Sequence, residues 1–202
     1  MALDRAAAEA FLCAAQRPDG AWGYRPDGMA FVEPTALAVI ALRARPETAP
    51  VRARALDWLE RLQQVDGGLP AFVGDDQASW MTALAALALV GRPAGERALD
   101  WLVRLHQAQP VFRGDVERLR WAAGIDGRQR GWPWVSGDAT WVEPTAWAVL
   151  ALAVGGRREA PETRAGVDFL LDRAGPDGGW NIGNPYMLNK PMQSEVPFTA
   201  KA

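Results

Sequence analysis

The sequence has a single cysteine, Cys13, among its 202 residues. One thiol cannot form an internal disulfide, so the fold does not depend on an oxidising compartment. The opening stretch, residues 1–16, carries Asp4 and Glu9 within an alanine-rich amphipathic pattern. This is unlike the charged start and uninterrupted apolar centre of a signal peptide. We therefore predict a cytoplasmic protein.

Net charge and long apolar runs are also lacking. Lys and Arg number 22 against 24 Asp and Glu, which gives a formal net charge of −2. Such a balance creates no long-range field that attracts nucleic acid, so we expect no nucleic-acid partner. No segment approaches the roughly 20 apolar residues that span a bilayer. Peripheral contact is therefore the most that we expect of any membrane association.

Histidine is scarce as well, since His106 is the only one. A catalytic zinc site built from Asp, Cys and His would need both Cys13 and His106. No ligand spacing links these two residues. We therefore predict no metal ligands of this type and no cofactor, with Mg²⁺ as the one exception considered below.

What the sequence contains instead is a repeat. Three segments superpose without gaps, and each begins with a Thr-Ala pair that leads into an apolar stretch. The leading threonines are Thr35, Thr82 and Thr145, and a fourth copy begins at Thr199. They lie 47, 63 and 54 residues apart. This spacing fits one pair of helices with its loops in each unit.

A second helix, polar on one face, precedes each glycine turn. Asp-Gly pairs at Gly20, Gly67 and Gly178 supply residues that tolerate left-handed geometry, which ends a helix and turns the chain back. The third unit departs from the pattern through an insertion between Gln109 and Arg130. We expect helices over residues 2–17, 34–45, 51–65, 79–90, 95–108, 144–155 and 162–174.

The two kinds of helix predict two layers. The threonine-led helices are apolar nearly all round, whereas the others are amphipathic. Proline costs little at the first helical position because its amide would be unpaired there, so Pro34 and Pro144 are expected to begin two inner helices. We predict an all-α fold of about four helix-hairpin repeats with inner and outer layers, that is, an α/α toroid or a partial one.

The first repeat is the most complete. Its pattern consists of Arg5-Ala6, Phe11-Leu12, Gln16, Gly20 and Trp22. It resembles the QW repeat of squalene-hopene cyclases, and with it the terpenoid cyclase and protein prenyltransferase superfamily. The resemblance implies a structural role in which the glutamine ties a helix end to its neighbour and the tryptophan stacks on it. Later copies depart from the pattern at Leu69, His106 and Ala174.

The resemblance also implies that more repeats are needed. Toroids of the family close with more helix pairs than this chain carries, and the fourth copy stops soon after it begins. We therefore expect a single α/α-toroid repeat domain over residues 1–202, incomplete at its C-terminus. Such a chain is expected to self-associate or to depend on residues beyond Ala202.

Two glutamates stand where the resemblance places an acid catalyst. Class II terpene cyclases carry a DxDD motif before the Thr-Ala pair of one inner helix, and that motif is absent here. Glu33 and Glu143 each precede a Pro-Thr-Ala sequence, at the position of the middle Asp. In an apolar, tryptophan-lined cavity, a carboxylic acid can stay protonated and donate its proton to an alkene. Alternatively, both carboxylates face the positive end of a helix dipole and have no catalytic role.

Two further features could bind a diphosphate. Asp75 and Asp76 form the only adjacent acidic pair, and their hard oxygens could hold Mg²⁺ with a diphosphate. The alternative is that they cap a helix or order a solvated turn. The arginines within 113–130 could bind a diphosphate through bidentate guanidinium groups, although interspersed acids favour a solvated surface loop.

Ten tryptophans is a high number for this length. Trp58 and Trp101 recur at matched positions of the outer helices and are expected to pack there. The others surround the loops and the starts of inner helices, where their faces could stabilise a carbocation, stack on an isoprenoid or sugar, or simply pack. The candidates for substrate contact are Trp22, Trp80, Trp134, Trp141, Trp147 and Trp180.

These features leave three functional hypotheses. The leading one is an isoprenoid-handling, terpene-cyclase-like domain that binds an apolar prenyl-type small molecule or initiates its cyclisation by acid. The second is a non-catalytic repeat scaffold that binds a partner protein, with the glutamates as helix caps. The third is a carbohydrate-active toroid, in which tryptophans stack on sugar and a carboxylate pair hydrolyses glycosides.

Overall fold

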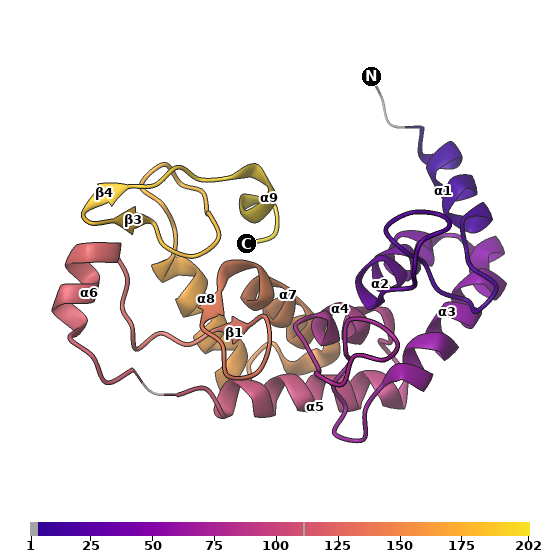
Figure 1. The fold of residues 1–202 in the computed structure, drawn as a ribbon, viewed down its shortest axis with the longest axis horizontal. Helices are drawn as coiled ribbons and strands as arrows, with labels where there is room; N and C mark the ends of the chain where they lie inside the picture. Colours follow the sequence, from indigo (N-terminus) through magenta and orange to yellow (C-terminus); the bar gives the residue numbers. More distant parts are fainter. Residues whose placement is uncertain (1–3, 111) are drawn as a thin grey trace. The chain divides into compact units, whose positions relative to one another are not determined.

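The fold is mostly helical (Figure 1). The computed structural model describes residues 4–110 and 112–202. The helices are α1 (Arg5–Ala14), α2 (Val32–Ala41), α3 (Ala49–Leu62), α4 (Met81–Ala88), α5 (Pro93–Gln107), α6 (Val116–Ala123), α7 (Val142–Leu152), α8 (Pro161–Asp172) and α9 (Val196–Thr199). Short helical turns are η1 (Leu42–Ala44), η2 (Pro46–Thr48) and η3 (Ala153–Arg157). Two antiparallel pairs of strands are β1 (Trp132–Pro133) with β2 (Thr140–Trp141), and β3 (Tyr186–Met187) with β4 (Lys190–Pro191).

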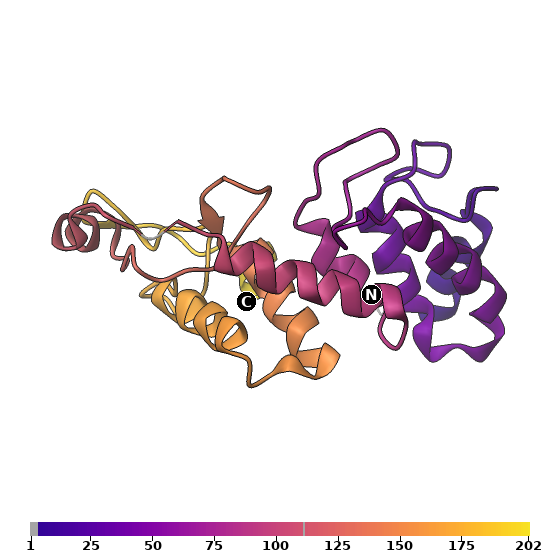
Figure 2. The same cartoon turned by 90° about the horizontal axis from the view of Figure 1, so that it is seen from below.

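The chain consists of two compact units, Met1–Ala98 and Leu99–Ala202. In the first unit α2 packs against both α3 and α4, and in the second α7 packs against α8 (Figure 1, Figure 2). The prediction of a single domain over residues 1–202 stays a prediction. Within the part of the chain that the structure describes, no helix is long and apolar enough to cross a membrane.

The inner and outer helices differ in burial as the sequence predicts. Every residue of α4 from Thr82 to Ala88 is buried. By contrast, α3 buries only Ala55, Trp58 and Leu59 along its length. An all-round apolar helix is stable only inside, whereas an amphipathic helix covers the core with one face. The predicted fold class, an all-α repeat of the helix hairpins that make up α/α toroids, is confirmed.

Two inner helices begin earlier than predicted. α2 starts at Val32 and α7 at Val142, two residues before the prolines that were expected to open them. Proline is tolerated within the first turn because the first four amides of a helix have no intrahelical partner. As a correction to the sequence analysis, Glu33 and Glu143 therefore lie inside the first helical turn rather than before it.

The insertion contains a helix that the sequence analysis did not predict, α6. Asp115 caps its start by accepting a hydrogen bond from the Arg118 amide at 3.0 Å. Gly124 ends it in the left-handed conformation, with φ 73°. Val116, Leu119 and Ala123 follow a helical spacing, but eight residues are too short a stretch for this periodicity to identify the helix.

Glutamine side chains at the ends of outer helices connect each outer helix to the next one. Gln16 Nε2 donates to the Gly20 and Val51 carbonyl oxygens, both at 2.8 Å. Gln63 Nε2 makes the same pair of bonds in the next repeat, to the Gly67 and Ala94 carbonyl oxygens, both at 2.9 Å. Each glutamine thus ties the turn after one outer helix to the first turn of the next. The Gly20 and Gly67 carbonyl groups lie in turns outside the helices, so the glutamine supplies each with a donor.

Each repeat also has a threonine that fixes its turn. The Oγ1 atom accepts a hydrogen bond of 2.9 Å from a backbone amide of the preceding turn in all four copies. The pairs, amide first, are Trp22 with Thr35, Leu69 with Thr82, Trp132 with Thr145, and Trp180 with Thr199. The threonines therefore occupy equivalent positions, and the fourth copy is a true repeat.

The tryptophans of three turns bind backbone carbonyl groups of outer helices. Trp22 Nε1 donates to the Leu12 carbonyl oxygen at 2.9 Å, and Trp180 Nε1 donates to that of Leu170 at 2.7 Å. Trp132 Nε1 donates to the Leu102 carbonyl oxygen at 2.9 Å, more than one turn before α5 ends at Gln107. The insertion thus leaves the third tie intact, although it delays the tryptophan along the sequence.

Candidate functional site

The candidate site in the first unit centres on Glu33, in the first turn of α2. The Tyr24 hydroxyl donates a short hydrogen bond to the Glu33 carboxylate. Partial burial, and then the hydrogen bond to Glu33 and its negative charge, raise the pKa of Tyr24 above its usual value. Tyr24 therefore keeps its proton at neutral pH and remains a donor to this carboxylate.

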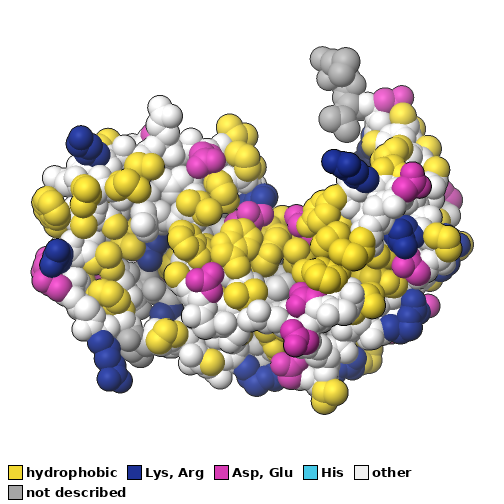
Figure 3. Space-filling view, in the orientation of Figure 1, with side chains coloured by type: hydrophobic (Ala, Val, Ile, Leu, Met, Phe, Trp, Pro, Cys, Tyr) yellow, Lys and Arg dark blue, Asp and Glu magenta, His cyan; other side chains and the backbone are white. Residues whose placement is uncertain are grey.

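An aromatic cluster adjoins this pair. The Tyr24 and Phe31 rings lie 4.9 Å apart between centroids, and the Phe31 and Phe72 rings lie 5.5 Å apart in an edge-on arrangement. Backbone hydrogen bonds bring these loops together, since the Phe31 amide donates to the Trp22 carbonyl oxygen and the Val32 amide to that of Ala71. Hydrophobic side chains gather over this region of α2 (Figure 3). The site thus joins a carboxylate to an aromatic surface.

A small pocket lies on the other side of Tyr24. Its volume is 120 Å³, and its lining includes Phe11, Trp22, Tyr24 and Pro34. A cavity of about 150 Å³ accommodates benzene. This pocket therefore fits a group of about five carbons, and a longer chain would extend over the surface.

Glu143, the equivalent residue of the second unit, has a different partner. It forms an ion pair with Lys201 Nζ, and its side chain is only 12% exposed. A general acid must carry the proton that it donates, whereas this contact joins a carboxylate to an ammonium group. Trp141, which precedes α7, has a buried indole nitrogen without a hydrogen-bond partner in the described part of the chain.

Asp75 and Asp76 make hydrogen bonds that are typical of an ordered turn. Asp75 accepts hydrogen bonds from the Ala71 amide at 3.0 Å and the Gln77 amide at 3.1 Å. The Asp76 carbonyl oxygen accepts one from Gln64 at 2.8 Å. Among the described residues, no group of three or more His, Cys, Asp or Glu side chains could hold a metal ion. These contacts fit the alternative of an ordered turn.

The remaining tryptophan candidates are spread over both units. Trp80 precedes α4, Trp147 lies on α7 and Trp134 follows β1, and all three are half-buried. Trp180 packs on the core cluster of α7 and α8, in addition to its bond to Leu170. Of the predicted tryptophans, only Trp22 lines the pocket beside Tyr24.

Two arginines of the insertion form ion pairs with a buried aspartate. Arg128 and Arg120 approach Asp126 Oδ2 at 2.6 and 3.3 Å. Hydrogen bonds from the Arg128 side chain, and then from its amide, hold the pKa of Asp126 well below its usual range. The Asp126 amide in turn donates to Asp172 of α8 at 3.0 Å. These two guanidinium groups thus order the insertion internally, and the bond from the Asp126 amide to Asp172 joins it to α8.

The sequence analysis missed Tyr24, Phe31 and Phe72. A signal was present for the first two, because Tyr24 follows Trp22 at the offset at which Trp134 follows Trp132, and Phe31 matches Trp141. Phe72 has no such counterpart. Its place depends on the loop pairing, which no side-chain pattern reveals.

Comparisons with known proteins bear on this site. No family model matches the chain. It is 32% identical over 199 residues to drimenyl diphosphate synthase of Streptantibioticus cattleyicolor, an alignment that covers 96% of this chain and 35% of that protein. It is 50% identical over 42 residues to squalene–hopene cyclase of Alicyclobacillus acidocaldarius, which covers 21% of this chain and 6% of the relative. The predicted resemblance to terpenoid cyclases is confirmed.

The terpenoid-cyclase-like chain spans about a third of the length of the first curated relative and far less of the second. Among solved structures, the chain matches a protein from Actinoplanes at 20% identity and a TM-score of 0.48, over 87% of this chain and 66% of that one. The type II terpene cyclase MstE from Scytonema, in its apo form, has 17% identity and a TM-score of 0.41 over 88% and 64% of the two chains.

Proposed function

We propose that this chain is an isoprenoid-handling domain that binds a prenyl group on the aromatic surface beside Glu33. The observation that carries the proposal is the cluster of Tyr24, Phe31 and Phe72 next to a carboxylate and a 120 Å³ pocket. Aromatic faces provide large apolar contact areas, and branched five-carbon units match the pocket in size. The name of the drimenyl diphosphate synthase relative adds support for a prenyl diphosphate as the ligand class.

Acid-initiated cyclisation by Glu33 is the more specific form of this proposal. It would require Glu33 to carry a proton, whereas here the Glu33 carboxylate accepts one hydrogen bond from Tyr24. We therefore propose prenyl binding as the primary role of the site. For Glu143 the ion pair with Lys201 favours the non-catalytic alternative, a helix-start carboxylate in a repeat scaffold.

Other predictions of the sequence analysis remain proposals of the same kind. We propose a cytoplasmic location, peripheral membrane contact at most and a single repeat domain over residues 1–202. Mg²⁺ binding by Asp75 and Asp76 would serve the diphosphate end of such a ligand. The carbohydrate alternative remains a hypothesis, in which tryptophans stack on sugar and a carboxylate pair hydrolyses glycosides.

Isothermal titration of the purified chain with farnesyl diphosphate and with farnesol tests the proposal. Phe72→Ala is expected to weaken binding of both ligands about tenfold or more, since it removes a large aromatic contact. Val73→Ala is the matched control, because Val73 is the exposed neighbour of Phe72. Product analysis by mass spectrometry shows whether cyclisation follows. Equal affinities for the two variants, or no binding of either ligand, would contradict the proposal.

A further inference from the structure

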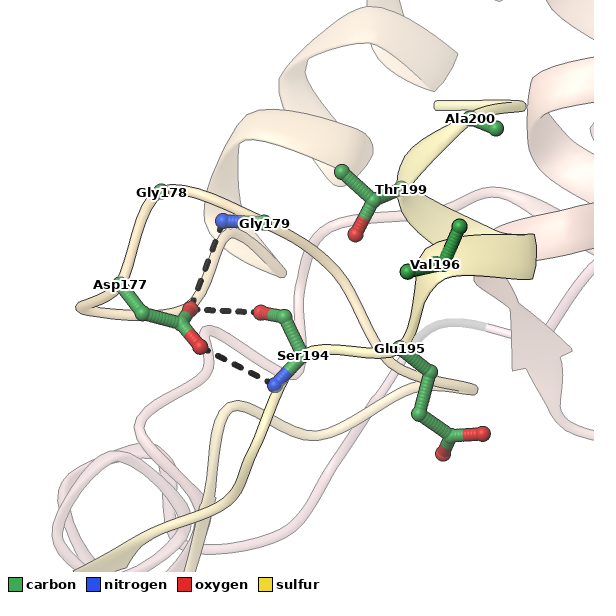
Figure 4. Close-up of a pocket in the computed structure, with 8 residues that line it drawn as sticks. All are labelled: Asp177, Gly178, Gly179, Ser194, Glu195, Val196, Thr199 and Ala200. Atoms are coloured by element: carbon green, nitrogen blue, oxygen red, sulfur yellow. Dashed lines mark hydrogen bonds between the residues drawn. The ribbon is translucent and has the colours of Figure 1, made fainter.

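The turns of the four repeats are held by three chemically different side chains. Gln16 and Gln63 hold the first two turns through their amide groups. In the fourth repeat Asp177 orders the turn, because its carboxylate accepts hydrogen bonds from the Ser194 amide at 3.1 Å and from its hydroxyl at 2.5 Å (Figure 4). The third repeat has His106 at the glutamine position. Histidine is the one of these three residue types whose charge ordinarily changes between pH 5 and 8.

His106 makes the bond that glutamine makes in the earlier repeats. Its Nε2 atom lies 3.2 Å from the Arg130 carbonyl oxygen. Arg130 precedes Trp132 by two residues, the same offset at which Gly20 precedes the tryptophan of the first repeat. A carbonyl oxygen can only accept, so Nε2 carries the proton in this contact. The imidazole ring thus replaces the glutamine amide in its bond to the turn.

The second bond of the repeat glutamine is replaced by a contact of the neighbouring residue. Gln107 Nε2 donates to Glu162 Oε1 at 2.7 Å, and Glu162 lies in the first turn of α8. Gln16 and Gln63 likewise reach the first turn of their next outer helix. The hydrogen bond from Gln107 lowers the pKa of Glu162, so this carboxylate stays ionised. Loss of the His106 bond would therefore free the turn and leave the contact between α5 and α8 in place.

The surroundings of His106 disfavour a second proton on its ring. The residue is 3% exposed, and its ring lies 4.6 Å from that of Trp132 between centroids. Among the described residues, the charged groups that act on it are Arg130 from the turn and Glu162 from α8. Burial is the main cause that lowers the pKa of His106, and the charge of Arg130 adds to it, whereas the bond to the carbonyl oxygen and the charge of Glu162 oppose it. The neutral ring is therefore the form that fits the folded junction.

We propose that His106 makes the third repeat junction sensitive to pH, because the neutral ring holds the Arg130 turn and protonation releases it. The insertion between Gln109 and Arg130 leads into this turn, so its C-terminal end loosens with the turn. Since the folded junction favours the neutral ring, this bond contributes fully above the unfolded pKa of about 6.5 and is lost as the pH falls below it. This inference goes beyond the proposed function and does not depend on prenyl binding.

Hydrogen exchange followed by mass spectrometry between pH 4.5 and pH 7.5 tests the proposal. After correction for the intrinsic exchange rate, residues 128–132 should lose protection about threefold or more at the acidic end. Residues 18–22, in the turn that Gln16 holds, are the control within the same molecule and should keep their protection. His106→Gln restores the side chain of the other repeats and should make residues 128–132 insensitive to pH. Constant protection in the unmodified chain, or a loss that persists in His106→Gln, would overturn the proposal.

NMR spectroscopy of the imidazole ring provides the second test, because His106 is the only histidine of the chain. This measurement needs no substitution, so it holds even where His106→Gln does not fold. We expect a single titration with a pKa below the ordinary value of about 6.5, and the amide signals of Arg130 and Trp132 should shift along the same curve. A pKa at or above 6.5, as expected if Trp132 or Glu162 stabilised the charged ring, would overturn the proposal.

Discussion

Three carboxylates of the chain have different hydrogen-bond or ion-pair partners, and the partner of each determines whether it can bind a ligand. Glu33 accepts a hydrogen bond from a neutral phenol, Glu143 pairs with an ammonium group, and Asp126 lies between two guanidinium groups. Charged partners fix a carboxylate as a structural anion, whereas a neutral donor leaves it able to meet a ligand. For this reason Glu33, rather than Glu143, is the residue that we connect with binding.

Asp126→Asn should destabilise the second unit by about 1–3 kcal/mol at pH 7, because it removes a charged acceptor from Arg120 and Arg128. Since the pKa of Asp126 is lowered in the folded state, its contribution is present above the unfolded value of about 3.9 and is lost as the pH falls below it. Urea unfolding at pH 7 and pH 3 measures the difference. Asp76→Asn, at an exposed position, is the control and should have little effect at either pH.

Tyr24 should ionise at a higher pH than an ordinary tyrosine, because its pKa is raised. The chain has two tyrosines, Tyr24 and Tyr186. Absorbance at alkaline pH should show one of them ionising with a pKa above the usual value of about 10, because partial burial and then Glu33 disfavour the phenolate. Glu33→Gln should bring this transition down, and Tyr24→Phe should remove it. An unchanged late transition in Tyr24→Phe would show that the assignment is wrong.

At the scale of elements, the turns connect one repeat to the next in addition to the packing of α2 on α4. Gly67 has φ +93°, and a Cβ atom there would lie 2.3 Å from the Arg97 carbonyl oxygen at the start of the next outer helix. The turn can approach this helix so closely only because it has no side chain at that point. Gln63 then bonds both sides of the same junction. Gly67 and Gln63 thus both stabilise the junction between this turn and the next outer helix.

Gly67→Ala should therefore destabilise the first unit far more than Gly74→Ala. Gly74 also has a left-handed backbone, φ +97°, but no heavy atom lies within 4 Å of its Cβ position. Both variants carry the backbone cost of about 1 kcal/mol, and only Gly67→Ala adds the clash, about 1–3 kcal/mol. Urea denaturation monitored by tryptophan fluorescence compares them. Equal midpoints would show that the turn does not need its close contact with Arg97.

The sequence predicted the repeat well because Thr35, Thr82 and Thr145 each begin an apolar run that only a buried helix satisfies. It predicted the site less well. The hydrogen bond between Tyr24 and Glu33 depends on the path of the loop between them, which is set by backbone bonds rather than by periodicity. α6 was missed for a different reason, since its eight residues are too few to show a clear helical periodicity.

The four threonine bonds also determine how the protein opens. Each joins a loop amide to the first turn of the helix that follows, as Thr35 does with the Trp22 amide and Thr145 with that of Trp132. Such an amide cannot exchange its hydrogen with solvent until that helix start has frayed. We therefore expect each loop and the inner helix that follows it to open together as one cooperative unit. The four amides, one in each repeat, are natural reporters of the local opening free energy along the chain.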